Sequence, residues 1–336
     1  MLKKIIIILL VILAAGFLFW QNLNSPVDSS GREQTFLVNK GETIKQIVNN
    51  LRTANLIRSP FYFKYQAWRG KLNIKAGEYL ISPKLTAKEI IKILSAGEAV
   101  SRDKNITLIE GWDMKDMAAY LEKNQIISAG EFLKLAQIPL SSWKLSFSKA
   151  DFLNDAPAKA NLEGYLFPDT YRVVAGASAE QIINKMFNNF DKKLTPEMRA
   201  DILAQKKTIY QIMTMASLIE KEVRTQADMK IVSGIFWDRI KYGLPLQSDA
   251  SLSYILDDKI GGHTVEQTKI DSPYNTYKYR GLPFGPIANP GLNAIKAAIY
   301  PVVTEYNYFL SDPETGQTVY GQTLEEHNYN KAKYLK

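Results

Sequence analysis

Glu220 carries the side chain whose type and position best suit chemistry. We expect a helix over residues 209–223, where apolar residues recur at helical spacing and form one stripe. Glu220 falls inside this stripe, whereas Glu222 falls well away from it. Burial disfavours the charged form of a carboxyl group, so we expect a raised pKa for Glu220, as a general acid near neutral pH requires. The alternative is a buried glutamate paired with an arginine, for which Arg239 is a candidate.

Glycosidic bond cleavage is one reaction that such an acid could perform, because it needs a proton donor at the leaving oxygen. Composition argues against several other classes. The chain has no cysteine, which excludes disulfides, thiolate nucleophiles, iron–sulfur clusters and Cys-ligated zinc. Its only histidines, His263 and His327, are too few for us to expect a His-ligated zinc enzyme, and the sequence has no G-x-S-x-G motif. We therefore expect no metal and no cofactor.

The charge balance indicates a mildly basic surface. The sequence has 42 Lys or Arg against 34 Asp or Glu, a net charge of +8, without long runs of like charge. This fits an ordinary solvated surface or an affinity for an anionic polymer or lipid face. Because no nucleic-acid-binding motif accompanies it, no nucleic-acid partner is expected.

The N-terminal segment predicts a membrane anchor. Residues 5–20 carry no charge (IIIILLVILAAGFLFW), at the short end of the roughly 17–25 residues that cross a bilayer, and snorkelling of Lys3 and Lys4 would extend the span. The alternative is a cleaved signal peptide, but the aromatic end of the segment suits a membrane interface better than a cleavage site. Because the lysines precede the apolar run, we expect a cytoplasmic N-terminus. Residues 21–34, rich in Asn, Ser, Pro and Gly, predict a flexible tether.

A small βααβ module is predicted after the tether. Residues 35–38 and 77–81 have the pattern of strands, and between them Thr43 and Ser59-Pro60 predict the starts of two helices. This order of elements resembles a LysM-like module, a small fold often used to grip glycan chains. A further short helix is expected over residues 86–94.

An internal repeat predicts a second unit of the same kind. When the sequence is shifted by 70 positions, Gly41 falls on Gly111 and Leu51 on Leu121. We infer a second βαα unit over residues 105–137, with its strand at residues 107–109. The alternative is that any strand, turn and amphipathic helix would show this spacing.

The second half of the chain predicts helices that carry long loops. Capping signals at Ser178, Thr195 and Thr208 predict three helices, and Asn289-Pro290 predicts another that ends before Pro301. We expect an α+β protein with an N-terminal membrane helix, LysM-like βαα(β) modules, and a mainly helical catalytic domain with long loops and short strands. The predicted parts are an anchor (1–22), a linker (23–34), a LysM-like module (35–104), a second βαα unit with connector (105–160) and the catalytic domain (161–336).

Six segments carry a resemblance to a known family. They are LEGYLFPDTY (162–171), ASLIEKEV (216–223), IFWDRI (235–240), LPLQSDASLSY (244–254), SPYNTY (272–277) and GLPFGPIANPG (281–291). In this order and spacing they closely resemble the endolytic murein transglycosylase family (MltG/YceG-like), from about residue 35 to the end. The sequence departs from the usual residues at Val223, Asp238 and Phe284, which bears on fine substrate contacts and not on the acid.

The resemblance implies a lyase that cuts peptidoglycan glycan strands between MurNAc and GlcNAc without water. The family's catalytic residue is the first glutamate of its E-K-E pair, which corresponds to Glu220 here. The C6 hydroxyl of the sugar would then be the nucleophile, so the product would end in 1,6-anhydro-MurNAc and one carboxyl group would suffice. The resemblance further implies action on nascent strands during cell-wall assembly.

Other motif residues are expected to bind and position the sugar. They are Gln247, Ser248, Asp249, Ser272, Tyr274, Asn275, Thr276, Tyr277 and Glu163. Glu163 either helps the site or anchors the loop before Tyr165. Glu222 either tunes Glu220 or forms a salt bridge at the surface. Asn289 is favoured as a helix cap over a ligand, and His327 has a surface or structural role or a role in the site.

The expected partners follow from this interpretation. They are peptidoglycan glycan strands, the membrane through residues 5–20 and, as a family-level expectation, cell-wall synthases. The expected location is the cell (inner) membrane, crossed once, with the bulk of the chain periplasmic or otherwise extracytoplasmic. The rival interpretation is a non-catalytic, membrane-anchored peptidoglycan-binding scaffold, against which the retained Glu220 and SPYNTY segment argue.

Overall fold

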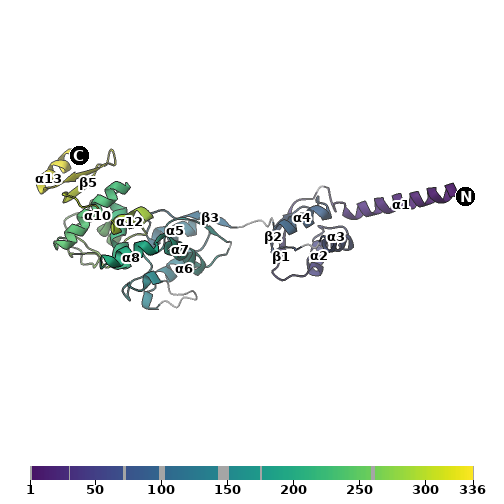
Figure 1. Ribbon diagram of the computed structural model, residues 1–336, viewed down its shortest axis with the longest axis horizontal. Helices are drawn as coiled ribbons and strands as arrows, with labels where there is room; N and C mark the ends of the chain where they lie inside the picture. The colour runs from purple at the N-terminus through teal and green to yellow at the C-terminus, as the bar shows by residue number, and fades with distance from the viewer. Residues whose placement is uncertain are drawn as a thin grey trace. The chain divides into compact units, whose positions relative to one another are not determined.

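The computed structural model describes residues 2–29, 31–70, 73–97, 103–142, 151–174, 176–258 and 262–335 (Figure 1). The chain divides into two compact units, Met1–Arg102 and Asp103–Lys336. Helices and short two-stranded sheets occur in both, so the expected mixture of helix and strand is confirmed. Each unit is described by itself.

The first unit begins with α1 (Leu2–Asn24), which is long and apolar enough over Ile6–Asn24 to cross a membrane. The flexible tether predicted for residues 21–34 is wrong for its first part. Helix α1 continues to Asn24, and Arg58 donates hydrogen bonds to the side chain of Asn22 and to the carbonyl of Pro26, each at 2.9 Å. The backbone N–H groups of residues 27 and 28 donate to the carbonyl of Pro83. The tether was predicted from composition, which gave no sign of these partners.

A βααβ module follows, in the predicted order of elements. It comprises β1 (Gln34–Val38), α2 (Ile44–Thr53), α3 (Pro60–Arg69), β2 (Gly77–Ile81) and α4 (Ala87–Ala96). Strands β1 and β2 pair antiparallel with Phe36 opposite Tyr79, and both side chains face a core that the helices cover. Thr43 caps α2, and Ser59 with Pro60 starts α3, as predicted. The likeness to LysM remains a prediction.

The second unit has one continuous core. Its elements are β3 (Lys104–Thr107), α5 (Met114–Lys123), α6 (Ala129–Ala136), η1 (Leu140–Ser142), η2 (Asp151–Leu153), β4 (Thr170–Val173), α7 (Ala179–Lys193), α8 (Pro196–Ala204), α9 (Ile209–Glu222), α10 (Gln226–Lys241), α11 (Asp249–Leu256), η3 (Gln267–Lys269), α12 (Leu292–Ile299), β5 (Tyr308–Ser311), β6 (Thr318–Gly321) and α13 (Leu324–Tyr334). Strand β3 pairs with β4, with Ile106 opposite Tyr171, so the second βαα unit shares a sheet with the chain that follows it. The predicted border between residues 160 and 161 therefore falls inside this unit.

Helix α9 lies at the centre of the second unit, in contact with α8, α10, α11 and α12. The predicted apolar stripe is buried, and so are Met215 and Leu218 on its other sides. The buried surface of α9 is therefore wider than the predicted stripe, since the helix is enclosed on nearly every face. This central position sets the environment of the carboxyl groups at its C-terminal end.

Candidate active site

Glu220 lies in the last turn of α9 and is half-buried. Its Oε2 atom accepts a hydrogen bond of 2.9 Å from the backbone N–H of Gly291, the residue that precedes α12. The alternative pairing of Glu220 with Arg239 is not what the structure shows. The guanidinium of Arg239 instead donates to the carbonyl of Leu246 at 2.6 Å and to that of Asn307 at 2.8 Å.

A second carboxyl group, that of Glu110, faces the same point. Glu110 lies in the turn between β3 and α5, and a Cβ atom placed on Gly291 would lie only 2.0 Å from Glu110 Oε1. The next residue, Gly111, lies against the side chain of Glu220, and its carbonyl accepts a hydrogen bond of 3.3 Å from Lys221. Glycine at position 291 thus allows the Glu110 carboxyl group to approach the N–H group that holds Glu220.

These surroundings raise the pKa of Glu220 above its ordinary value. Desolvation by burial is the largest cause, and the negative charge of Glu110 acts in the same direction. The hydrogen bond from Gly291 and the charge of Lys221 favour the carboxylate and oppose the shift. The net direction keeps Glu220 protonated to higher pH than a free glutamate, which suits a proton donor.

Asn289, just before α12, connects its own segment to two others near Glu220: the turn at Trp112 and residues 163–166. Its Oδ1 accepts hydrogen bonds from the N–H groups of Gly164 and Leu166, each at 2.9 Å, and its Nδ2 donates to the carbonyl of Trp112 and to Glu163. The prediction that Asn289 caps a helix is wrong, because α12 begins at Leu292 after Gly291. Its side chain is fully buried and serves the contacts between segments instead.

Glu163 is a buried anchor of this arrangement. Its carboxyl oxygens accept hydrogen bonds from the N–H of Met114 at 3.2 Å and from Asn289 at 2.8 Å. Burial, with a smaller effect of the nearby charge of Asp113, raises the pKa of Glu163 to about 8. Of the two roles open to Glu163 from sequence, these contacts support the anchoring of its loop.

Glu222 faces a different feature, a cleft of about 920 Å³. The Ser248 hydroxyl donates a hydrogen bond to the Glu222 carboxyl group, which is half-buried. Burial raises the pKa of Glu222 to about 7, with the charge of Asp249 acting in the same direction and Ser248 and Arg239 opposing it. Glu222 is therefore not the exposed member of a surface salt bridge. Glu220 is not among the residues that line this cleft, although Lys221 and Glu222 are.

Some of the predicted sugar-binding residues line the cleft. Gln247, Asp249 and Tyr277 do so, and the Tyr277 hydroxyl donates a hydrogen bond to Asp249. His327 also lines the cleft, and its ring stacks on Tyr308. Ser248 is buried and reaches the cleft only through its bond to Glu222.

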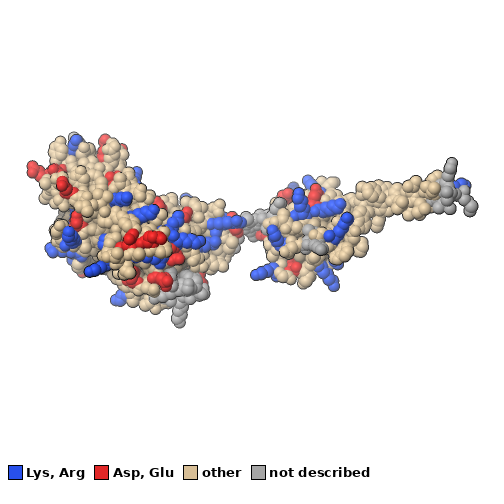
Figure 2. Space-filling view, viewed as in Figure 1, with Lys and Arg blue, Asp and Glu red and all other residues tan. Residues whose placement is uncertain are grey.

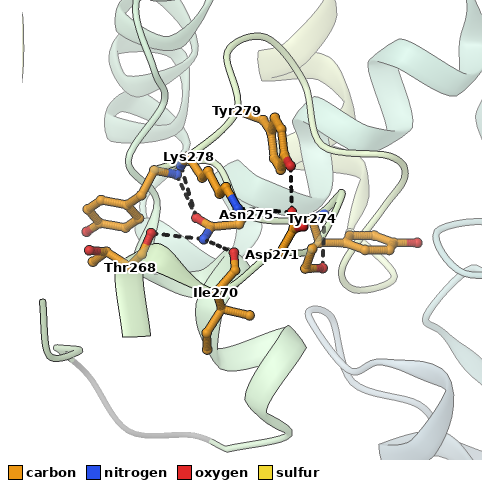
Figure 3. Close-up of polar contacts among 9 residues, drawn as sticks. Thr268, Ile270, Asp271, Tyr274, Asn275, Lys278 and Tyr279 are labelled. Atoms are coloured by element: carbon orange, nitrogen blue, oxygen red, sulfur yellow. Dashed lines mark hydrogen bonds and ion pairs between the residues drawn. The ribbon is translucent and has the colours of Figure 1, made fainter. Parts of the chain in front are cut away.

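The other predicted residues hold the SPYNTY loop together. Asn275 is buried, and its Nδ2 donates to the carbonyls of Thr268 and Ile270 at 3.0 and 2.7 Å while its Oδ1 accepts from two backbone N–H groups (Figure 3). The buried hydroxyl of Thr276 accepts a hydrogen bond of 3.0 Å from the N–H of Ser248. The described contacts of Asn275 and Thr276 are thus internal, and their direct role in sugar binding remains a prediction.

The last two predicted residues stand at the start of the same loop. The hydroxyl of Ser272 accepts a hydrogen bond of 3.3 Å from the N–H of Tyr274. The half-buried ring of Tyr274 packs between Tyr254 and Phe284, at centroid distances of 5.0 and 5.9 Å. Neither residue lines the cleft, so a sugar contact for them is also still a prediction.

Sequence reasoning missed Glu110. The repeat had aligned the adjacent Gly111 with Gly41, which marked a turn but gave no reason to place it beside Glu220. Within the described ranges, no cluster of three or more His, Cys, Asp or Glu side chains could hold a metal ion, so no residue is assigned to one.

Comparisons with known proteins agree with this geometry. A sequence model of the YceG-like family matches residues 36–333. The Endolytic murein transglycosylase of Bacillus subtilis is 31% identical over 97% of this chain and 91% of its own length. The protein of the same name from Streptococcus pneumoniae is 28% identical over 98% of this chain, which spans 64% of that longer protein. A crystal structure of a YceG-like protein from Listeria monocytogenes aligns with a TM-score of 0.59 and 32% identity, over 89% of this chain and 99% of the other.

Proposed function

The chain belongs to the YceG-like family, and we propose that it is a membrane-anchored lytic transglycosylase that cleaves the glycan strands of peptidoglycan. The relatives named as endolytic murein transglycosylases support the reaction class. The single observation that carries the proposal is the environment of Glu220, a half-buried carboxyl group with a raised pKa that accepts one backbone hydrogen bond.

The reaction that we assign breaks the bond between MurNAc C1 and the oxygen that links it to GlcNAc. Protonated Glu220 gives its proton to that oxygen, which leaves with the bonding electron pair. The C6 hydroxyl oxygen of MurNAc forms the new bond to C1, and its proton passes to the Glu220 carboxylate. The product ends in 1,6-anhydro-MurNAc, no water is consumed, and Glu220 returns to its starting state. Because the attack is intramolecular, proximity supplies much of the rate.

The surroundings of Glu220 support both halves of this cycle. Burial and the charge of Glu110 favour the acid form that donates the proton. The N–H of Gly291 favours the carboxylate that forms when the proton has left. In this proposal Gln247, Asp249 and Tyr277 bind the glycan in the adjoining cleft, with Glu222 held in place by Ser248.

The location of the enzyme is part of the proposal. Helix α1 would cross the membrane once, and Lys3 and Lys4 in its first turn, before the apolar span, would keep the N-terminus in the cytoplasm. The unit that holds Glu220 would then work outside, on nascent strands and beside cell-wall synthases.

The test is digestion of purified glycan strands by the full chain in detergent, with mass spectrometry of the products. We expect anhydro-MurNAc ends from the wild type and none from Glu220→Gln. Reducing ends would show a hydrolase instead. Binding of strands without cleavage by the wild type would favour the rival interpretation, a non-catalytic peptidoglycan-binding scaffold.

A further inference from the structure

Helix α3 of the first unit exposes large aromatic side chains. Phe61 is 69% exposed and Trp68 is 76% exposed. With Tyr65 between them, these residues stand at positions i, i+4 and i+7, so they share one side of the helix. Aromatic rings of this size are usually buried in water-soluble domains, and a group of them on one face indicates a contact surface.

This aromatic side lies beside the end of the apolar helix α1. The ring of Trp20 packs edge-on against Tyr62 and Tyr65, with centroid distances of 5.1 and 5.2 Å, and Tyr65 is in turn 6.4 Å from Trp68. Figure 1 shows α1 entering the module next to α3. Arg58 bonds to Asn22 in the last turns of α1 and to Pro26 just after it, and these bonds keep α3 close to the point where α1 ends.

The same region carries a strong positive charge. Between Glu42 and Glu78 the sequence contains seven Lys or Arg and no Asp or Glu. Two of these residues, Lys64 and Arg69, are exposed on α3 itself. Figure 2 shows several groups of lysine and arginine side chains, and fewer acidic ones, on the visible face of this module. Basic residues beside a membrane helix are attracted to anionic lipid headgroups.

We propose that α3 lies in the lipid headgroup layer, next to the point where α1 leaves the membrane. Its interfacial face consists of Phe61, Lys64, Tyr65, Trp68 and Arg69. Aromatic rings are enriched at the boundary between lipid tails and headgroups, and the basic side chains would bind anionic headgroups there. The proposal rests on the membrane anchoring included in the proposed function, but not on the chemistry of Glu220.

A glycan strand could also stack on exposed aromatic rings, but the position of these residues favours lipid. The interfacial face continues from an apolar helix through Trp20, so the two surfaces would enter one layer together. The consequence is that the module is held flat against the membrane and does not swing freely on its anchor.

Depth measurements on the full chain in vesicles test this proposal. Because the chain has no cysteine, single substitutions Phe61→Cys and Trp68→Cys can each carry a spin label while the remaining aromatic residues stay in place. Leu13→Cys in α1 reports insertion. Leu37→Cys is the matched control, because Leu37 is an exposed apolar residue on the face of β1 that points away from the helices.

In vesicles of phosphatidylcholine with phosphatidylglycerol, we expect labels at positions 61 and 68 to collide more with lipid-soluble oxygen than with an aqueous nickel chelate. The label at position 37 should show the opposite. Adding Lys64→Glu and Arg69→Glu to Phe61→Cys should move that label toward the aqueous value.

Three outcomes would overturn the proposal. If position 13 is inserted but positions 61 and 68 behave like position 37, the face does not touch lipid. If soluble glycan strands shield positions 61 and 68 while lipid does not, the face binds glycan. If the label at position 13 is itself exposed to water, α1 does not anchor the chain and this proposal fails. Strand digestion still tests the chemistry of Glu220 separately.

Discussion

Glu220 and Glu222 lie two residues apart at the end of one helix, yet the protein treats them differently. Glu220 is held by a backbone N–H from Gly291 and faces another carboxyl group, Glu110. Glu222 is held by the hydroxyl of Ser248, near the guanidinium of Arg239, in the wall of a cleft. Burial raises the pKa of both.

The difference lies in what each carboxyl group can do with its proton. The turn of Glu110 brings a like charge to Glu220, and no arginine approaches it among its described contacts, so its environment favours proton donation. Glu222 accepts its hydrogen bond from the hydroxyl of Ser248, a residue whose backbone N–H donates to Thr276, and this suits a positioning role. A raised pKa alone therefore does not distinguish an acid catalyst from a residue that shapes the cleft, and the partners do.

The largest expected effect is that of Glu220→Gln. Loss of the proton donor should reduce strand cleavage by about 10³-fold or more, within the range seen for general acids. The matched control is Glu222→Gln, which should keep cleavage within about 10-fold and affect KM more than kcat. Mass spectrometry of the released products over time measures cleavage by both variants. Equal losses in the two variants would remove the distinction between the two carboxyl groups.

Gly291→Ala should have the next largest effect. The new methyl group would lie about where the Glu110 carboxyl group now is, so either Glu110 or the chain before α12 must move. Displacing the N–H that binds Glu220 should lower kcat by about 10²-fold, as the loss of one stabilising donor does elsewhere. Gly130→Ala, at an open position in α6, is the control and should leave kcat unchanged. Full activity of Gly291→Ala would show that this hydrogen bond is dispensable.

Ser248→Ala should change the hydrogen bonding and pKa of Glu222 without changing the surroundings of Glu220. Removing the buried hydroxyl that donates to the half-buried Glu222 carboxyl group should cost about 1–2 kcal/mol of unfolding free energy and raise KM several-fold. Because Ser248 lowers the pKa of Glu222, its loss should raise that pKa further. Urea unfolding and the pH dependence of KM measure these changes. A change in the pH dependence of kcat would contradict the separation of the two sites.

Local signals in the sequence were enough to predict most helix starts. Thr208 with Gln211 forms the capping box that opens α9, and Ser178 with Gln181 does the same for α7. Both patterns depend on residues three positions apart, so they can be recognised in the sequence alone. The strand predicted at residues 107–109 lies instead at Lys104–Thr107, because its partner, β4, is more than sixty residues away and was not expected.

Contacts between distant segments could not be predicted in this way. Helix α10 was not among the predicted helices, and the glycine in its middle, Gly234, argues locally against a helix. The structure explains that glycine, since a Cβ atom there would lie 2.1 Å from the carbonyl oxygen of Val302. The apolar stripe predicted that Glu220 lies on an inward side of α9, and Glu220 is half-buried there. Of the two roles left open for Glu222, the surface salt bridge is not what the structure shows, because α9 is enclosed on nearly every side.

Glu110→Gln should have the smallest effect. It tests most closely whether the like charge beside Glu220 distinguishes this residue from Glu222. The negative charge of Glu110 raises the pKa of Glu220, so its removal should lower that pKa. Cleavage needs the protonated acid and is lost as pH rises through the pKa of Glu220. The alkaline limb of the kcat profile should therefore move to lower pH, by about one unit or less. Glu131→Gln, an exposed glutamate in the first turn of α6, is the control and should leave this limb in place. A shift to higher pH, or an equal shift in the control, would mean that Glu110 does not set the proton affinity of Glu220.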